Sequence, residues 1–333
     1  MKRLTFLSIL LCIGLNLIAI AEQPQQPDGK AADMTKPVQV FILMGQSNML
    51  GFGKISKLQG IAKEKYPYLV DEAGIWTVRK DVRNVRLVGS GGGEAKLSLN
   101  EWLSVSKGIG KSKQIGPEIG IGNYLGEVID APVLILKVCI GNRSLGFDLL
   151  PPSAEGYQGN KEANPRAPSK NHKKWYAGIQ YDGDVSNALN ALKDIGKYYP
   201  GASKYEIGGF FFWQGAKDSG NLMNAVKYEK NLVCLINDLR KDFNAPKAPF
   251  VCATMGHAKK EGKGNATRIT KAQLAVDGKT GKYPEFKGNV ATFYSHPVSK
   301  GGSANGHYGG NPETYMNVGE GMGKAMVELL KKK

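Results

Sequence analysis

Three short polar segments that follow apolar runs contain residue types able to hydrolyse an ester. Ser47 lies in the segment Gly45-Gln46-Ser47-Asn48-Met49, directly after the apolar run 38–43. A serine at a tight strand-to-helix turn can present its hydroxyl as a nucleophile, and the N–H groups of the following helix can hold an oxyanion. The same position also suits a helix N-cap, so nucleophile and cap are both open interpretations of Ser47.

Two further segments supply hydrogen-bond donors. Gly141 follows the apolar run 133–139 and would let the backbone approach a ligand closely, while Gln214 follows the run 205–213 and carries an amide NH2. The alternatives are a simple glycine turn and a glutamine bonded to a neighbouring loop. Glu118, after Gly116-Pro117, is typical of the first turn of a helix, and a role in a site is the second interpretation.

A serine nucleophile needs a base. The histidines of the chain are His172, His257, His296 and His307. His307 has the most favourable position, because it follows the last apolar run by a loop and precedes the C-terminal amphipathic segment. His296, directly before a proline, ranks second, and a structural role is the default for the other histidines.

Five apolar runs separated by amphipathic stretches predict the sheet that positions these residues. Such runs are typical of parallel strands buried on both faces, and the stretches between them have helical spacing. Ligands bind at the carboxyl ends of strands in sheets of this kind. The predicted strands are 38–43, 133–139, 205–213, 250–254 and 290–294, and the clearest apolar stripes lie within 185–195, 232–239 and 318–329.

Two long insertions interrupt this pattern, at 54–114 and 149–176. The first predicts a hairpin around 76–87 followed by a flexible stretch at 90–93. The second contains Tyr157, Trp175 and Tyr176, which could stack on sugar rings or, more simply, anchor the loop.

The N-terminus has the pattern of a secretory signal peptide. Lys2 and Arg3 precede an apolar run that ends in Ala19-Ile20-Ala21, which predicts cleavage after Ala21 and a secreted or periplasmic protein. An uncleaved anchor is the alternative, and no other run of about 18 apolar residues predicts a membrane span. Residues 22–36 are polar and contain two prolines, which predicts a flexible tether before a single domain at 37–333.

Cysteine and metal-ligand patterns are weak. Cys139, Cys234 and Cys252 each lie in an apolar segment, which favours buried free thiols over a disulfide framework, although one bridge is the alternative. The sequence contains no CxxC pair, HExxH motif or EF-hand loop, so we expect neither a metal nor a cofactor.

Together these motifs resemble the SGNH/GDSL hydrolase superfamily, and more narrowly its sialate O-acetylesterase-like branch, which includes the acetyl xylan esterases of carbohydrate esterase family six. The resemblance rests on GQSNM at 45–49, IGPE at 115–118, IGNRSL at 140–145, WQGAKD at 213–218 and the His307 loop. It implies a flavodoxin-like three-layer α/β/α sandwich with a five-stranded parallel sheet, and ester hydrolysis without metal or cofactor.

The resemblance also implies roles for individual residues. Ser47 matches the nucleophile and His307 the base, while the Ser47 N–H, Gly141 and Gln214 match the oxyanion hole. We expect three further residues to contact the substrate, Asn142, Glu118 and Trp213.

One position departs from the family pattern. The superfamily commonly has an aspartate three residues before its histidine, but here that residue is Ala304. Three options follow: Asp218 or another loop acid orients His307, a backbone carbonyl does so, or the protein is a weak or altered catalyst. We favour the first two options and take Asp218 as the orienting acid.

These observations predict a secreted serine esterase that removes O-acetyl groups from a glycan, either sialic acid or a plant or algal polysaccharide. The alternative is a glycan-binding protein that has kept the fold and lost catalysis. The formal charge of +16, which becomes +14 once Lys2 and Arg3 leave with the leader, favours an acidic glycan attracted by long-range steering. Nucleic-acid binding is disfavoured, because the lysines are dispersed and the protein is predicted to be exported.

Overall fold

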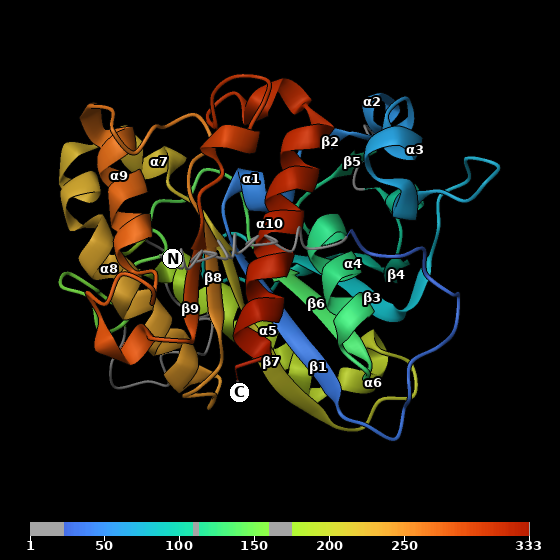
Figure 1. Ribbon diagram of the computed structural model, residues 1–333. Coiled ribbons are helices and arrows are strands. Elements are labelled where there is room, and N and C mark those ends of the chain that lie inside the picture. The colour runs from blue at the N-terminus through green and yellow to red at the C-terminus, as the bar shows by residue number, and fades with distance from the viewer. Residues whose placement is uncertain (1–22, 109–112, 160–174, 333) are drawn as a thin grey trace, which may run out of the picture.

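The computed structural model describes residues 23–108, 113–159 and 175–332, which form an α/β domain around one sheet (Figure 1). The strands are β1 (Val38–Gly45), β2 (Gly53–Lys54), β3 (Arg79–Val88), β4 (Lys96–Leu103), β5 (Gln114–Ile115), β6 (Val133–Val138), β7 (Tyr205–Trp213), β8 (Phe250–Ala253) and β9 (Val290–Phe293). The α-helices are α1 (Ser47–Leu50), α2 (Ile55–Gln59), α3 (Ala62–Lys65), α4 (Glu118–Val128), α5 (Ile179–Lys193), α6 (Ile195–Tyr198), α7 (Ala216–Ser219), α8 (Leu222–Asp242), α9 (Gly264–Ala275) and α10 (Pro312–Leu330). Short 3-10 helices are η1 (Pro67–Leu69), η2 (Val105–Lys107), η3 (Pro284–Phe286), η4 (His296–Val298) and η5 (His307–Gly310).

The main sheet has seven strands in the order β4-β3-β6-β1-β7-β8-β9. All neighbouring pairs are parallel except β3 and β4, which run antiparallel at one edge. The five predicted strands are confirmed as β1, β6, β7, β8 and β9. The predicted count of five is wrong, because β3 and β4 extend the same sheet.

The two additional strands come from the first insertion, where a hairpin was expected, and their composition explains why they were not predicted as strands of the main sheet. β3 has the sequence RKDVRNVRLV and β4 has KLSLNEWL, so charged residues interrupt the apolar pattern that marks a buried strand. The hairpin is therefore larger than the one expected around 76–87. The glycine-rich stretch around 90–93 belongs to the connection between its two strands, instead of following them.

Helices cover both faces of the sheet, as the sequence predicts. α4 and α10 pack against each other over one face, with α10 crossing in front of β1 in Figure 1. α5, α8 and α9 share the opposite face, because they connect parallel strands that progress in one direction across the sheet and such crossovers are right-handed. The result is the expected three-layer sandwich, with the ends of β1, β6 and β7 meeting at one edge.

The segment expected to be a flexible tether forms no helix or strand over 23–37, yet it lies against the domain. Gln23 donates to the Lys65 carbonyl at 3.0 Å, and Gln26 donates to the Val70 carbonyl at 2.6 Å. The predicted signal peptide lies outside the described residues.

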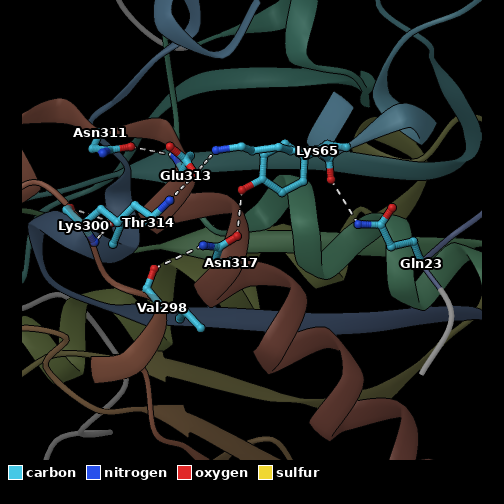
Figure 2. Close-up of polar contacts among 9 residues, drawn as sticks. Gln23, Lys65, Val298, Lys300, Asn311, Glu313, Thr314 and Asn317 are labelled. Carbon is cyan, nitrogen blue, oxygen red and sulfur yellow. Dashed lines mark hydrogen bonds and ion pairs between the residues drawn. The ribbon is translucent and has the colours of Figure 1, made fainter. Parts of the chain in front are cut away.

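A polar network continues from Lys65 to the start of α10 (Figure 2). Lys65 and Lys300 each donate to Glu313 at 2.7 Å, and Asn311 caps α10 by accepting from the Glu313 N–H. Thr314 exchanges hydrogen bonds with the Lys300 backbone. The network therefore pins both ends of the loop that carries the predicted base.

In the described part of the chain, no helix is long and apolar enough to cross a membrane. Cys139, Cys234 and Cys252 are free thiols; Cys139 and Cys252 are buried, as expected, whereas Cys234 is only partly buried. The same residues contain no group of three or more His, Cys, Asp or Glu side chains that could hold a metal ion.

Candidate active site

An open pocket of about 730 Å³ lies at the edge where β1, β6 and β7 end, and its lining includes residues of α1 and α7. Its volume falls within the range typical of small-molecule sites. It draws residues from four segments that are far apart in the sequence. The lining residues are Gln46, Ser47, Phe52, Gly141, Asn142, Ala216, Lys217, Gly220, Asn221, Asn224, Asn305 and His307.

Ser47 is the first residue of α1, and its hydroxyl is free. The N-cap of α1 is Gln46, so Ser47 does not act as the cap that was its alternative interpretation. The tight turn needs glycine at position 45, where φ is 149° and a Cβ would lie 2.3 Å from the Trp213 carbonyl oxygen. Ser47 Oγ has no hydrogen-bond partner among the described residues and is not sealed from solvent, so it opens onto the pocket.

Gly141 lies beside Ser47. A Cβ added at Gly141 would lie 3.6 Å from the Ser47 Cβ, and no other atom outside its chain neighbours would come within 4 Å. Neither the Gly141 N–H nor the Ser47 N–H donates to a backbone or side-chain acceptor in the described chain. The N–H of Ser47 and the N–H of the neighbouring Gly141 are therefore both free to donate to an oxyanion, as an oxyanion hole requires. Asn142 adopts the left-handed conformation (φ 58°) that asparagine tolerates well.

His307 lies in the same pocket, with its ring stacked on Phe52. The ring centroids are 3.9 Å apart and the planes differ by 7°. Burial lowers the pKa of His307, which favours the neutral form that a general base needs. Within the described residues, no hydrogen bond joins His307 to Ser47, and neither ring nitrogen has a partner. Histidine–serine hydrogen bonds of this kind are often loose or absent without substrate.

The loop that carries His307 has a strained backbone and is hydrogen-bonded to Asn48, the residue after the nucleophile. His307 and Tyr308 both have positive φ, at 51° and 53°. Asn48, directly after the serine, donates to the Ala304 carbonyl at 3.2 Å. The Tyr315 hydroxyl lies 3.2 Å from Asn48 Oδ1 and 3.3 Å from the His307 carbonyl oxygen. The residue after the nucleophile therefore helps to fix the position of the base.

The family comparison concerns the segment between Gly141 and His307 and includes neither of them. Residues 169–292 match the model of the family described as a carbohydrate esterase, sialic acid-specific acetylesterase. The chain carries a sialate O-acetylesterase-like domain. The match supports the resemblance that the motifs indicate, which is to carboxylic ester hydrolases.

Solved structures with the same fold support the architecture of this sialate O-acetylesterase-like domain. A protein from Arabidopsis thaliana is 19% identical with a TM-score of 0.54, covering 88% of this chain and 98% of that one. A carbohydrate acetylesterase from Xanthomonas citri is 14% identical with a TM-score of 0.55, covering 89% of this chain and 57% of that one. NanS is 12% identical with a TM-score of 0.52, covering 91% of this chain and all of its own. No curated protein matches the sequence.

Gln214, expected in the oxyanion hole of this esterase domain, is committed elsewhere. It is buried and does not line the pocket. Its Nε2 lies 2.8 Å from the Arg143 carbonyl, 2.5 Å from Asp218 Oδ2 and 3.2 Å from Gln46 Oε1. Its Oε1 accepts from the Tyr228 hydroxyl at 2.8 Å. Gln214 therefore matches its alternative interpretation, a glutamine bonded to neighbouring loops.

Asp218 does not orient His307 in this structure. Its carboxylate accepts from the Leu145 N–H at 2.9 Å and the Gly146 N–H at 2.7 Å, besides the Gln214 amide. Burial raises the pKa of Asp218, and the described chain shows no hydrogen bond or ion pair between it and His307. The expectation that Asp218 is the orienting acid is therefore not supported. Asp218 instead fixes the loop that follows Gly141.

Glu118 and Trp213, expected to contact substrate, are both buried away from the pocket. Glu118 forms an ion pair with Lys137 and accepts from the Gly116 N–H at 3.0 Å, while Lys137 also donates to the Leu50 carbonyl at 3.0 Å. Trp213 donates to the Thr254 carbonyl at 3.1 Å. Their positions indicate structural roles. A lysine inside the apolar run Val133–Val138 was the sequence signal for this buried pair.

The other described histidines, His257 and His296, form hydrogen bonds outside the pocket. His257 Nδ1 accepts from the Ala304 N–H at 3.2 Å, and His296 Nδ1 lies 2.8 Å from the Gly256 carbonyl oxygen. Burial lowers the pKa of His257, with a further contribution from His296. His172 lies outside the described residues. The structure thus places His307, and not His296, in the pocket.

Eight of the lining residues were not predicted as site residues, and three of them bear directly on the chemistry: Gln46, Phe52 and Lys217. Gln46 and Phe52 flank the serine segment, so their nearness to Ser47 was the available signal. Lys217 lies in the WQGAKD segment beside the aspartate that drew attention. Among the described lining residues, Lys217 carries the only permanent charge, and no carboxylate faces the pocket.

The aromatic residues of the second insertion are largely anchored. Tyr157 and Tyr176 both donate to the Asp182 carboxylate at 2.7 Å. Trp175 donates to Asp148 at 2.9 Å. The Arg143 guanidinium lies over the Trp175 ring, and its Cζ is 4.7 Å from the ring centroid. These contacts fit the simpler alternative of loop anchoring.

Proposed function

We propose that this protein is an exported serine esterase that removes O-acetyl groups from a glycan. The observation that carries the proposal is the free Ser47 hydroxyl, which opens onto one pocket with Gly141 and His307. That combination offers a nucleophile, backbone oxyanion donors and a base without requiring a metal or cofactor.

The reaction follows the logic of acyl transfer. His307 takes the proton of Ser47 as Oγ forms a bond to the ester carbonyl carbon, and the free N–H groups of Ser47 and Gly141 hold the resulting oxyanion. His307 then protonates the sugar oxygen as the bond between acyl carbon and that oxygen breaks. Water repeats the sequence on the acyl-enzyme, which releases acetate and regenerates Ser47.

The lining of the pocket supports an acidic sugar. Four asparagines, Asn142, Asn221, Asn224 and Asn305, offer amide groups that can bond to hydroxyls, and Lys217 offers a charge for a carboxylate. The Lys217 side chain is exposed and has no partner within the described chain. The positive formal charge of the whole protein adds long-range attraction for an anionic substrate.

Acetate release from an O-acetylated acidic sugar and from p-nitrophenyl acetate tests this proposal. Ser47→Ala should abolish both activities while leaving the melting temperature near that of the wild type. Lys217→Ala should lower kcat/KM only for the acidic sugar, by about five- to tenfold, as expected for one partly exposed charge contact. Hydrolysis that survives in Ser47→Ala would contradict the proposal.

Salt separates the charge argument from the chemistry. Added salt should lower kcat/KM for the acidic sugar and leave that for p-nitrophenyl acetate unchanged, since exposed charges are screened. An acidic substrate that is insensitive to salt would remove the steering role and leave the esterase intact.

One observation favours a second function, a glycan-binding protein without turnover. Ala304 occupies the usual position of the acid, and no described carboxylate contacts His307. Binding of an acetylated sugar with no acetate release, unaffected by His307→Ala, would establish that function.

A further inference from the structure

The oxyanion hole of the proposed esterase lacks the side-chain donor that the sequence assigned to it. Gln214 Nε2 has three acceptors within 3.2 Å, at Arg143, Asp218 and Gln46, and only two protons to share among them. Turning it toward substrate would leave the buried Asp218 carboxylate without that bond. Any third donor for the oxyanion therefore comes from another residue.

Gln46 has the properties that Gln214 lacks. It is 3% exposed, lines the pocket, and precedes the nucleophile in the chain. Its Oε1 accepts from Gln214 Nε2 and from the Lys217 N–H, both at 3.2 Å. Its Nε2 has no partner among the described residues, and it is not among the atoms sealed from solvent. The free amide nitrogen therefore opens onto the pocket.

The orientation of this amide is determined by its partners. The Lys217 backbone N–H can only donate, so the atom facing it must be the amide oxygen and the nitrogen must face the other way. Two donors on Oε1 fix the side chain and polarise its N–H groups. A preorganised donor costs little reorganisation when charge develops on the substrate.

We propose that the Gln46 amide is the third oxyanion donor, and that Gln214 and the Lys217 N–H are positioning groups that aim it. The inference rests on the proposed esterase function. During attack by Ser47, the carbonyl π electrons move to oxygen, and Gln46 Nε2–H donates to that oxygen together with the Ser47 and Gly141 N–H groups. No covalent bond to Gln46 forms or breaks.

The test compares Gln46→Met and Gln46→Glu with Gln39→Met, a matched control at the opposite end of β1. On p-nitrophenyl acetate, Gln46→Met should lose about 100-fold in kcat with KM within about threefold, as for the loss of one oxyanion donor. Gln46→Glu, which keeps the acceptor and removes the donor, should lose at least as much. Gln39→Met should match the wild type.

A boronic acid adds a readout that a structural role would not change. Its tetrahedral adduct with Ser47 carries the negative charge, so its inhibition constant should rise in Gln46→Met by about the same factor as kcat falls. Gln214→Met should also lower kcat, and the double variant should be no slower than Gln46→Met, because both act through one amide.

The inference is overturned if Gln46→Met keeps kcat within threefold while Gln214→Met loses about 100-fold, which would make Gln214 the donor. It is also overturned if Gln46→Met raises KM alone. Failure of the esterase proposal looks different: there, the wild type and Gln39→Met would show no Ser47-dependent hydrolysis at all.

Discussion

The nucleophile and the base of the proposed site are held in two different ways. Ser47 follows a strand at the centre of the sheet, in a turn that only glycine at position 45 permits. His307 lies in a loop with left-handed backbone and stacks on Phe52, with no acid against its ring among the described residues. The sheet thus fixes one half of the site, and loop contacts fix the other. We therefore expect kcat to be more sensitive to changes in the loop around His307 than to changes elsewhere in the site.

The largest effect should come from removing the base. His307→Gln should lower kcat on p-nitrophenyl acetate by about 10²- to 10⁴-fold, since general-base catalysis has that size. His296→Gln is the matched control, because His296 bonds to the Gly256 carbonyl outside the pocket. A His307→Gln variant with wild-type turnover would mean that the loop half does not supply the base.

The next effect tests the rigid half. Gly45→Ala places a Cβ against the Trp213 carbonyl at a φ that L-residues avoid, so we expect a loss of about 3 kcal/mol in the free energy of unfolding. Gly302→Ala is the control, because its φ is also positive (96°) but nothing lies within 4 Å of the added Cβ. Denaturant unfolding measures both. Equal losses in the two variants would show that close packing at Gly45 adds nothing to backbone strain.

A smaller effect should follow from removing the aromatic support of His307. Phe52→Leu should lower kcat about tenfold, because an aromatic pair contributes about 0.5–1.5 kcal/mol, whereas Phe52→Tyr should stay near the wild type.

The pH dependence of kcat/KM tests whether Phe52 lowers the pKa of His307. Burial lowers the pKa of His307, and the base must be neutral, so the acidic limb of kcat/KM lies below the ordinary histidine value of 6.5. Exposing the ring in Phe52→Leu raises the pKa and moves this limb to higher pH. An unmoved limb would show that Phe52 does not set the environment of His307.

The smallest effect concerns the network that pins the loop. Hydrogen bonds from Lys300 and then Lys65 lower the pKa of Glu313 below its ordinary value of 4.5. A lowered carboxyl pKa contributes stability above the unfolded-state value, and that stability is lost as pH falls through the folded-state value. Glu313→Gln should therefore cost about 0.5 kcal/mol at neutral pH and nothing near pH 2, measured by thermal unfolding. A constant difference at all pH values would contradict the ion-pair account.

The sequence predicts those features of the fold and the site that depend only on the type of one residue and the apolar composition of the strand before it. The meeting of Ser47, Gly141 and His307 in one pocket could be predicted, because each follows an apolar strand and parallel strands bring their carboxyl ends together. β3 and β4 could not be predicted as strands of this sheet, since charged and polar residues interrupt the apolar pattern in both of them.

The hydrogen-bond partners of the polar side chains at the site were harder to predict from the sequence. Gln214 and Asp218 have the right types and lie in the right loop, but they bond to each other at spacing i, i+4, and the sequence does not reveal that pairing. Gln46 gained its free amide only because Gln214 and the Lys217 N–H occupy its oxygen. Such partner choices depend on tertiary contacts, which is why the donor prediction needed the structure.

The central claim is that Ser47 becomes acylated. The direct measurement is mass spectrometry of peptides from protein mixed with p-nitrophenyl acetate and quenched with acid during turnover. The account predicts an acetyl group on the peptide containing Ser47, absent in Ser47→Ala and discharged on further incubation. Steady turnover with no acetyl group on Ser47, or with acetylation equally present in Ser47→Ala, would contradict it.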